Sequence, residues 1–241
     1  MFDDRSFRRA AAWAAIASAP LAIAGSLLTL AAVDFDLGAF ADPRARLGAG
    51  AHGAALWRWA MGFDLFGRYL LVAPMFALLA RHWRVRGDTG RALGAAGNAY
   101  VLAGALGAVV LAATLPPLMT AYAADPTQRA ALAPLFDVLS NAVYVGVWNM
   151  LATTLGGLAW LGFGAVLRAD RPGLASLTTT LGAASLVDAV ATMAGVHVVA
   201  MAALSIYLVL APLWAVSAGV DALELRRRES AALPVLIPRA G

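Results

Sequence analysis

The sequence predicts an all-α, polytopic membrane protein, a bundle of six transmembrane helices, and three observations lead to this fold class. The 241-residue chain is 61% hydrophobic and 13% charged, with a mean hydropathy of +0.75, whereas soluble domains are roughly half apolar and a quarter charged. Its apolar residues gather in runs of about 20 or more, the length that a helix needs to cross a bilayer. The arginines lie mainly in the short segments between these runs.

Six apolar runs meet this length, and each predicts one transmembrane helix. They cover residues 10–33, 55–80, 92–115, 134–167, 174–193 and 197–220 of a single transmembrane domain, followed by a tail at 221–241. The first run is longer than the roughly 7–15 residues of a signal-peptide core, so we interpret it as an uncleaved helix. The outer loop at 34–53 is long enough to hold a short interfacial helix.

Three features predict the boundaries of the last four helices. Pro116 and Pro117 follow the third run, and we expect them to stop its helix because proline lacks an N–H and clashes with the preceding turn. The fourth run is too long for one untilted crossing, so its first turns are expected at the membrane interface. The last two runs lie within one stretch of 47 residues, roughly 70 Å as a single helix. We therefore expect a turn at Ala194 and Gly195.

Arginine placement predicts the orientation, because cytoplasmic loops retain positive charge. All 18 basic residues are arginine. If the six runs alternate in direction, one side of the membrane holds Arg5, Arg8, Arg9, Arg81, Arg84, Arg86, Arg91, Arg168, Arg171, Arg226, Arg227, Arg228 and Arg239. The other side holds Arg44, Arg46, Arg58 and Arg129, and Arg68 lies inside a span. Both termini and the tail are therefore expected in the cytoplasm.

Ionisable side chains at membrane depth are the strongest functional signal. Asp64 and Arg68 lie one helical turn apart in the second run, where a charged residue costs about 2.5–3.5 kcal/mol on insertion scales unless a partner or cavity accepts it. The alternating topology brings polar groups of the fourth, fifth and sixth runs to a similar depth, in the outer leaflet. The candidate ligand-binding residues are Asp64, Arg68, Asp137, Asn141, Tyr144, Asp188 and His197. We expect them to face one another or water, and their acidic excess favours a cation.

These residues also have structural interpretations. The two charges of the second run can neutralise each other as an ion pair that lets the helix insert. The spacing of Asp137, Asn141 and Tyr144 predicts one shared helix face, but Asp137 can equally lie among lipid headgroups. Asp188 can belong to the turn between the last two runs, with His197 as an ordinary interfacial side chain.

The composition excludes several classes of function. The chain has 0 Cys, which excludes disulfides and cysteine nucleophiles, and its three histidines, His52, His82 and His197, show no ligand spacing for a metal or haem. No lysine is present to form a retinal Schiff base, and the common hydrolase and nucleotide motifs are missing. The net charge of +4 and the pI near 10.1 follow from membrane topology rather than nucleic-acid binding. We therefore expect no metal and no cofactor.

Two stretches of the chain carry a resemblance that covers nearly its whole length. The first combines the basic N-terminus, the first run, the outer loop at 34–54 and the charged second run; the second, residues 141–181, ends beyond a short basic turn. The residues that stand out in them are Asp64, Arg68, Trp148, Gly156, Gly157 and Gly164. This pattern resembles a bacterial family of six-pass membrane proteins defined only as a domain of unknown function. The resemblance implies a helical bundle in the inner membrane and carries over no activity or catalytic residue.

These observations favour a membrane protein that binds or transports a small molecule or an ion, a cation for example, through an outward-facing polar pocket. The alternative is a non-catalytic interaction or assembly subunit, whose arginine loops contact anionic lipid or a partner subunit of an oligomer. A third hypothesis is an intramembrane enzyme that uses Asp64 or Asp188 as acid or base. The lipid bilayer is the one partner that the composition itself requires.

Overall fold

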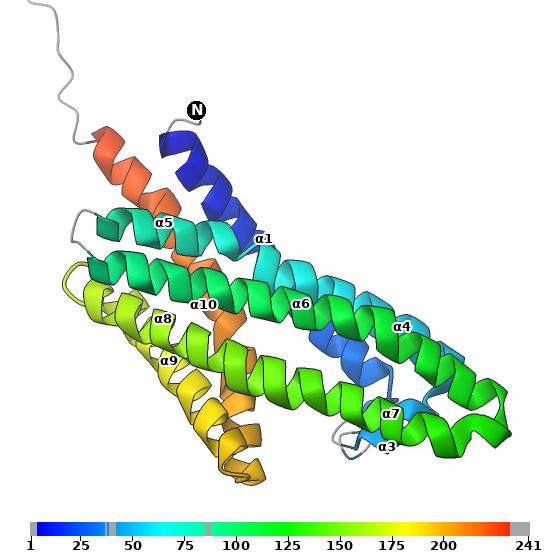
Figure 1. Cartoon of the computed structure of the whole chain (residues 1–241). Coiled ribbons are helices and arrows are strands. Elements are labelled where there is room, and N and C mark those ends of the chain that lie inside the picture. The colour runs from blue at the N-terminus through cyan, green and yellow to red at the C-terminus, as the bar shows by residue number, and fades with distance from the viewer. Residues whose placement is uncertain (1–3, 37, 39–41, 85–87, 232–241) are drawn as a thin grey trace, which may run out of the picture.

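The computed structural model describes residues 4–36, 38, 42–84 and 88–231, and the regular elements in these ranges are all helical. In chain order they are α1 (Asp4–Ala31), α3 (Pro43–Gly48), α4 (Gly50–Asp64), the π-helix η1 (Leu65–Leu70), α5 (Ala73–Arg84), α6 (Asp88–Ala124), the 3-10 turn η2 (Pro126–Gln128), α7 (Arg129–Asn141), the π-helix η3 (Ala142–Ala152), α8 (Thr153–Leu167), α9 (Pro172–Met193) and α10 (His197–Ala231) (Figure 1). The all-α fold class is confirmed for this part of the chain.

Six helical segments are long and apolar enough to cross a membrane. They are Arg5–Ala31, Gly50–Arg81, Asp88–Ala124, Pro126–Leu167, Pro172–Met193 and His197–Glu224. Each overlaps one of the six apolar runs, so the six-helix bundle is confirmed within the described ranges. The second segment comprises α4, η1 and α5, and the fourth comprises η2, α7, η3 and α8.

The third span corrects the expected helix end at Pro116 and Pro117. α6 continues through both prolines to Ala124. Three neighbours, α3, α4 and α7, pack against α6, Pro116 is buried, and the Thr120 hydroxyl donates to the Pro116 carbonyl at 3.0 Å. These contacts outweigh the local cost of two prolines in a helix.

The expected turn between the last two spans is confirmed. α9 ends at Met193 and α10 begins at His197. Between them Gly195 has φ +72°, a left-handed conformation that glycine adopts without the strain a Cβ would cause. The outer loop also contains the short helix expected there, α3, whose N-terminus is capped by the side chain of Asp42.

Figure 1 shows α6 running along the length of the molecule between α4 and α5 on one side and α7 and α8 on the other. α9 and α10 form a hairpin that leaves this arrangement at an angle, and they contact α8 and α1. The start of α1, the start of α6, the α8–α9 turn and the end of α10 lie at the same end of the molecule (Figure 1). We call it the arginine end, because the described residues there include Arg5, Arg8, Arg9, Arg91, Arg168 and Arg171. The opposite end, the α3 end, holds α3 and η2.

Buried aromatic rings fill the bundle on the arginine-end side of the charged residues. Phe76 of α5 lies 5.9 Å from Tyr100, 5.7 Å from Trp160 and 5.6 Å from Trp214 between ring centroids. Rings at these separations attract one another beyond the effect of their buried area. This aromatic cluster packs α5, α6, α8 and α10 against one another. Three of its members, Tyr100, Trp160 and Trp214, also line the cavity beside the polar site.

Candidate functional site

Asp64 and Arg68 form a buried ion pair in the second span. Asp64 ends α4, Arg68 lies in η1, and the two residues are 7% and 8% exposed. Arg68 Nε donates to Asp64 Oδ1 at 2.8 Å. Arg68 Nη2 donates to the Ala22 carbonyl at 3.3 Å and to the Ser26 hydroxyl, both on α1. Its other terminal nitrogen, Nη1, has no hydrogen-bond partner among the described residues.

Two glycines let α1 approach the second span closely enough to enclose this pair. A Cβ at Gly25 of α1 would lie 2.6 Å from Asp64 Oδ1. At Gly67 of η1 it would lie 2.7 Å from the carbonyl carbon of Leu21 on α1. Small residues are what allow helix backbones to meet closely in membrane proteins. The ion pair is therefore sealed by the crossing of α1 over η1.

The backbone of the second span is irregular beside the ion pair. The Leu71 N–H donates to the Phe66 carbonyl, five residues back, at 3.1 Å, and the Val72 N–H donates to the Tyr69 carbonyl, three residues back, at 3.2 Å. Pro74 follows and cannot donate to the turn before it. π-helical turns inside α-helices occur frequently at functional sites. Here the wide turn carries Arg68.

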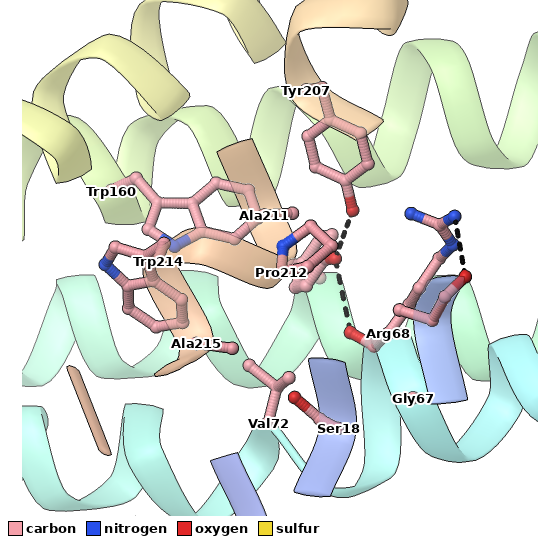
Figure 2. Close-up of a pocket in the computed structure, with 12 residues that line it drawn as sticks. Ser18, Gly67, Arg68, Val72, Trp160, Tyr207, Ala211, Pro212, Trp214 and Ala215 are labelled. Carbon is pink, nitrogen blue, oxygen red and sulfur yellow. Dashed lines mark hydrogen bonds between the residues drawn. The ribbon is translucent and has the colours of Figure 1, made fainter. Parts of the chain in front are cut away.

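A pair of tyrosines borders the site on the side of α6 and α10. The hydroxyls of Tyr100 and Tyr207 are 2.7 Å apart, and the Tyr100 hydroxyl donates to the Arg68 carbonyl at 3.4 Å. Figure 2 shows Tyr207 directed toward Arg68. Both tyrosines and Arg68 line a cavity of about 10 Å³, which is space for about one water molecule. The cavity is also lined by Ser18, Gly67, Val72, Trp160, Pro212 and Trp214 (Figure 2).

Asp137 and Tyr144 belong to a second polar cluster, nearer the α3 end. Arg46 of α3 is 7% exposed, and its Cζ lies 4.9 Å from the Tyr144 ring centroid and 5.8 Å from that of Trp57. Asp137 Oδ2 accepts from Nε of the exposed Arg44 at 3.5 Å. The Tyr144 ring centroid lies 5.1 Å from that of Trp148, which in turn lies 6.3 Å from the ring of Tyr69, the residue after Arg68. This second cluster therefore borders the first.

The predicted helix face of the fourth span is wrong for Asn141. Asn141 is exposed, whereas the neighbouring Ser140 is fully buried. The buried face of this span runs through Phe136, Ser140 and Val143, one position away from Asn141. Asn141 is the last residue of α7, and the way α7 packs in the bundle, which helical spacing does not determine, turns this position outward.

Asp188 and His197 lie apart from the ion pair. Asp188 is 1% exposed in α9, its Oδ1 accepts from the Thr192 hydroxyl at 3.3 Å, and its Oδ2 has no described hydrogen-bond partner. His197 begins α10 and is exposed. Within the described ranges no hydrogen bond or ion pair joins either side chain to Asp64 or Arg68. The seven candidate residues therefore do not form a single site.

Several polar residues at these sites carry only a weak sequence signal. The residues that the structure adds are Ser26, Arg46, Trp57, Tyr100, Ser140 and Tyr207. A hydroxyl or phenol in an apolar run commonly serves an ordinary helix contact, and an arginine in a loop commonly reports topology. Among the described residues no group of three or more His, Asp or Glu side chains could hold a metal ion.

No protein-family model, curated protein or solved structure matches the chain. The resemblance to a bacterial six-pass family therefore stays a prediction. The function has to be argued from the chemistry of the site itself.

Proposed function

We propose that the protein binds a small polar molecule or an ion inside the membrane, or carries it across, at the site around Asp64 and Arg68. One observation carries this proposal: Arg68 keeps a hydrogen-bond donor, Nη1, without a described partner, and the same residue lines a small cavity with Tyr100 and Tyr207. Charged side chains within membrane spans are retained mainly where they serve a substrate or ion pathway. A ligand that accepts hydrogen bonds would satisfy the donors that the helices leave open.

The helices around the cavity support this proposal because two of them depart from regular α-helical hydrogen bonding there. η1 breaks the second span at Arg68, and Pro212 lies inside α10 and lines the cavity. A proline within a helix leaves the carbonyl four residues earlier without its usual donor. Backbone groups that irregular helices leave unpaired bind ligands in many membrane transporters. Because the cavity holds about one water molecule, a larger ligand requires α10 to move away from η1.

The proposed location is the inner membrane of a bacterium, with both termini in the cytoplasm and the α3 end outside. The grouping of basic side chains at the arginine end supports this orientation, because positive charge is retained on the cytoplasmic side. In this orientation Tyr144, Arg46 and Asp137 lie between the ion pair and the outside. A ligand would reach Asp64 and Arg68 through that region.

Ligand retention and ion flux test the proposal. Wild-type protein, Asp64→Asn and Arg68→Gln are purified alike and analysed by mass spectrometry for bound small molecules, then reconstituted in liposomes with trapped dyes for Cl⁻, H⁺ and Na⁺. We expect the wild type to retain a molecule or to pass one of these ions, and both variants to lose that property. Ser205→Ala is the matched control, because Ser205 is exposed on α10 and bonds only within its own helix.

Two results would contradict the proposal: a wild type that retains no molecule and passes none of the three ions, or variants that behave like the wild type. The flux arm also separates the two forms of the proposal. Binding without flux indicates a sensor or receptor, and flux indicates a transporter.

The alternative, a non-catalytic assembly subunit, is favoured by the same ion pair in one respect. Asp64 and Arg68 neutralise each other at 2.8 Å. A pair of this kind can serve a purely structural role, in which it links α1 to the second span. A double variant, Asp64→Leu with Arg68→Met, separates the two functions, because it removes both charges and keeps apolar volume. Under the alternative this variant keeps a stoichiometric partner during purification. Under the main proposal it loses the bound molecule or the ion flux.

A further inference from the structure

A second group of unsatisfied polar atoms lies outside the ion pair, where α3 covers α4 and α7. Arg46, Trp57 and Ser140 are 7%, 1% and 0% exposed. Eight buried side-chain atoms in the described residues lack a hydrogen-bond partner, and five of them are here. They are Arg46 Nε, Trp57 Nε1, Asp137 Oδ1, Ser140 Oγ and the Tyr144 hydroxyl. Since buried polar atoms are normally paired, such a concentration requires an explanation.

Arg46 is the common contact of this group. Its guanidinium lies over the rings of Tyr144 and Trp57, whose centroids are 6.4 Å apart at an interplanar angle of 75°. The Tyr144 hydroxyl has no described hydrogen-bond partner, although the Arg46 guanidinium lies over its ring. Ser140 lies one turn before Tyr144 in the same span, so its hydroxyl is on the same side of the helix. The aromatic rings hold the cation in place but accept none of its hydrogen bonds.

The charges around Arg46 are not balanced by the described side chains. Asp137, in the same group, pairs with Arg44, whose side chain is 77% exposed. Arg46 itself forms no ion pair with a described carboxylate. A buried charge is costly unless a counter-charge and hydrogen bonds compensate for it. Four of the five unpaired groups are donors, and donors together with a cation select an anion.

We infer that Arg46, Trp57, Ser140 and Tyr144 form a binding site for an anionic phosphate group. Arg46 supplies the charge and a planar N–H donor, the geometry that suits phosphate oxygens, and the two hydroxyls and the indole N–H supply the remaining donors. The fifth atom, Asp137 Oδ1, is an acceptor. It repels a bare anion and favours a phosphate that also bears a hydroxyl or an ammonium group.

The position of the site fits two sources of such a phosphate. α3 lies between the first two spans and outside both, and it packs on the parts of α6 and α7 at the α3 end (Figure 1). Lipid headgroups occupy this level of a bilayer, and soluble phosphate compounds reach it from outside. The site uses no atom of Asp64 or Arg68, so it does not depend on the function proposed above.

Thermal stability with defined probes tests the inference. Wild type, Arg46→Gln and Arg44→Gln are purified in an uncharged detergent, and their Tm is measured with inorganic phosphate, with phosphatidylglycerol and with diacylglycerol, which lacks the phosphate. We expect phosphate or phosphatidylglycerol, but not diacylglycerol, to raise the wild-type Tm by several degrees. Arg46→Gln should lose this rise. Arg44→Gln, which removes an exposed arginine two residues away on the same helix, should keep it.

The pattern of responses identifies the source of the phosphate. A rise with phosphatidylglycerol alone assigns the site to a lipid headgroup, and a rise with inorganic phosphate extends it to soluble phosphates. No rise with either probe, or an undiminished rise in Arg46→Gln, overturns the inference. Tyr144→Phe and Ser140→Ala keep the test decisive if Arg46→Gln does not fold. Each should increase the half-saturating probe concentration severalfold, and unchanged values in both would also overturn it.

Discussion

At the scale of single residues, we expect breaking the buried ion pair of Asp64 and Arg68 to lower the free energy of unfolding strongly. Asp64→Asn leaves the Arg68 guanidinium buried without its counter-charge, which we expect to destabilise the protein by about 3–5 kcal/mol, as for other broken buried pairs. The matched control is Asp88→Asn, because Asp88 and Arg91 form an ion pair three residues apart in which both side chains are exposed, and such pairs contribute little. Unfolding in detergent, followed by circular dichroism, measures both variants.

The double variant Asp64→Leu with Arg68→Met distinguishes the net contribution of the ion pair to the free energy of unfolding from the cost of leaving one charge unpaired. Replacing both partners of a buried pair with apolar side chains is often neutral or stabilising by about 1–4 kcal/mol, so the double variant should recover most of the stability that Asp64→Asn loses. If Asp64→Asn and Asp88→Asn unfold alike, the second span does not bury its charges as described.

The residues of the site differ in how far the sequence could reveal them. The contact of Asp64 with Arg68 follows from a spacing of four within one helix. Ser26, Tyr100 and Tyr207 come from three other helices, and their meeting depends on how those helices cross. That information is not local to any stretch of the sequence.

At the scale of elements, the crossing of α1 over η1 depends on a glycine. Gly67→Ala places a Cβ against the backbone of α1, so α1 must shift, and overpacking of this kind costs about 1–3 kcal/mol. Gly62→Ala is the control in the same span, because a Cβ there meets nothing within 4 Å. It should be neutral or stabilise the helix by up to about 1 kcal/mol. Equal Tm values for the two variants would show that α1 and η1 do not touch at Gly67.

The helix ends show which element features are local. The turn at Gly195 is set by a left-handed residue, and the sequence identifies it because glycine is the residue that suits this conformation. Pro116 and Pro117 locally favour a helix end, yet α6 passes through them because α3, α4 and α7 pack against it. The exposed position of Asn141 could not be predicted either, because it depends on how α7 packs against its neighbours rather than on spacing within α7.

At the scale of the whole molecule, the number of spans follows from the lengths of the apolar runs, because a run of about 20 residues can cross the bilayer as a helix that satisfies its own backbone hydrogen bonds. How the spans converge does not follow. The shared depth of Asp64, Asp137 and Asp188 suggested one pocket, but depth fixes only one coordinate. The angular position of each side chain around the bundle depends on packing, which separates Asp188 in α9 from the ion pair in the second span.

The orientation of the bundle can be tested directly because the chain has 0 Cys. Ala130 of α7 and Ala169 of the α8–α9 turn are both exposed, and they lie at the α3 end and the arginine end (Figure 1). With cytoplasmic termini, a membrane-impermeant maleimide should label Ala130→Cys in intact bacterial cells and Ala169→Cys only after lysis. The opposite pattern reverses the orientation that the arginines predict. Labelling of both sites in intact cells would place residues 130 and 169 on the same side of the membrane. That result would contradict the crossing by the fourth span, and with it the six-span bundle.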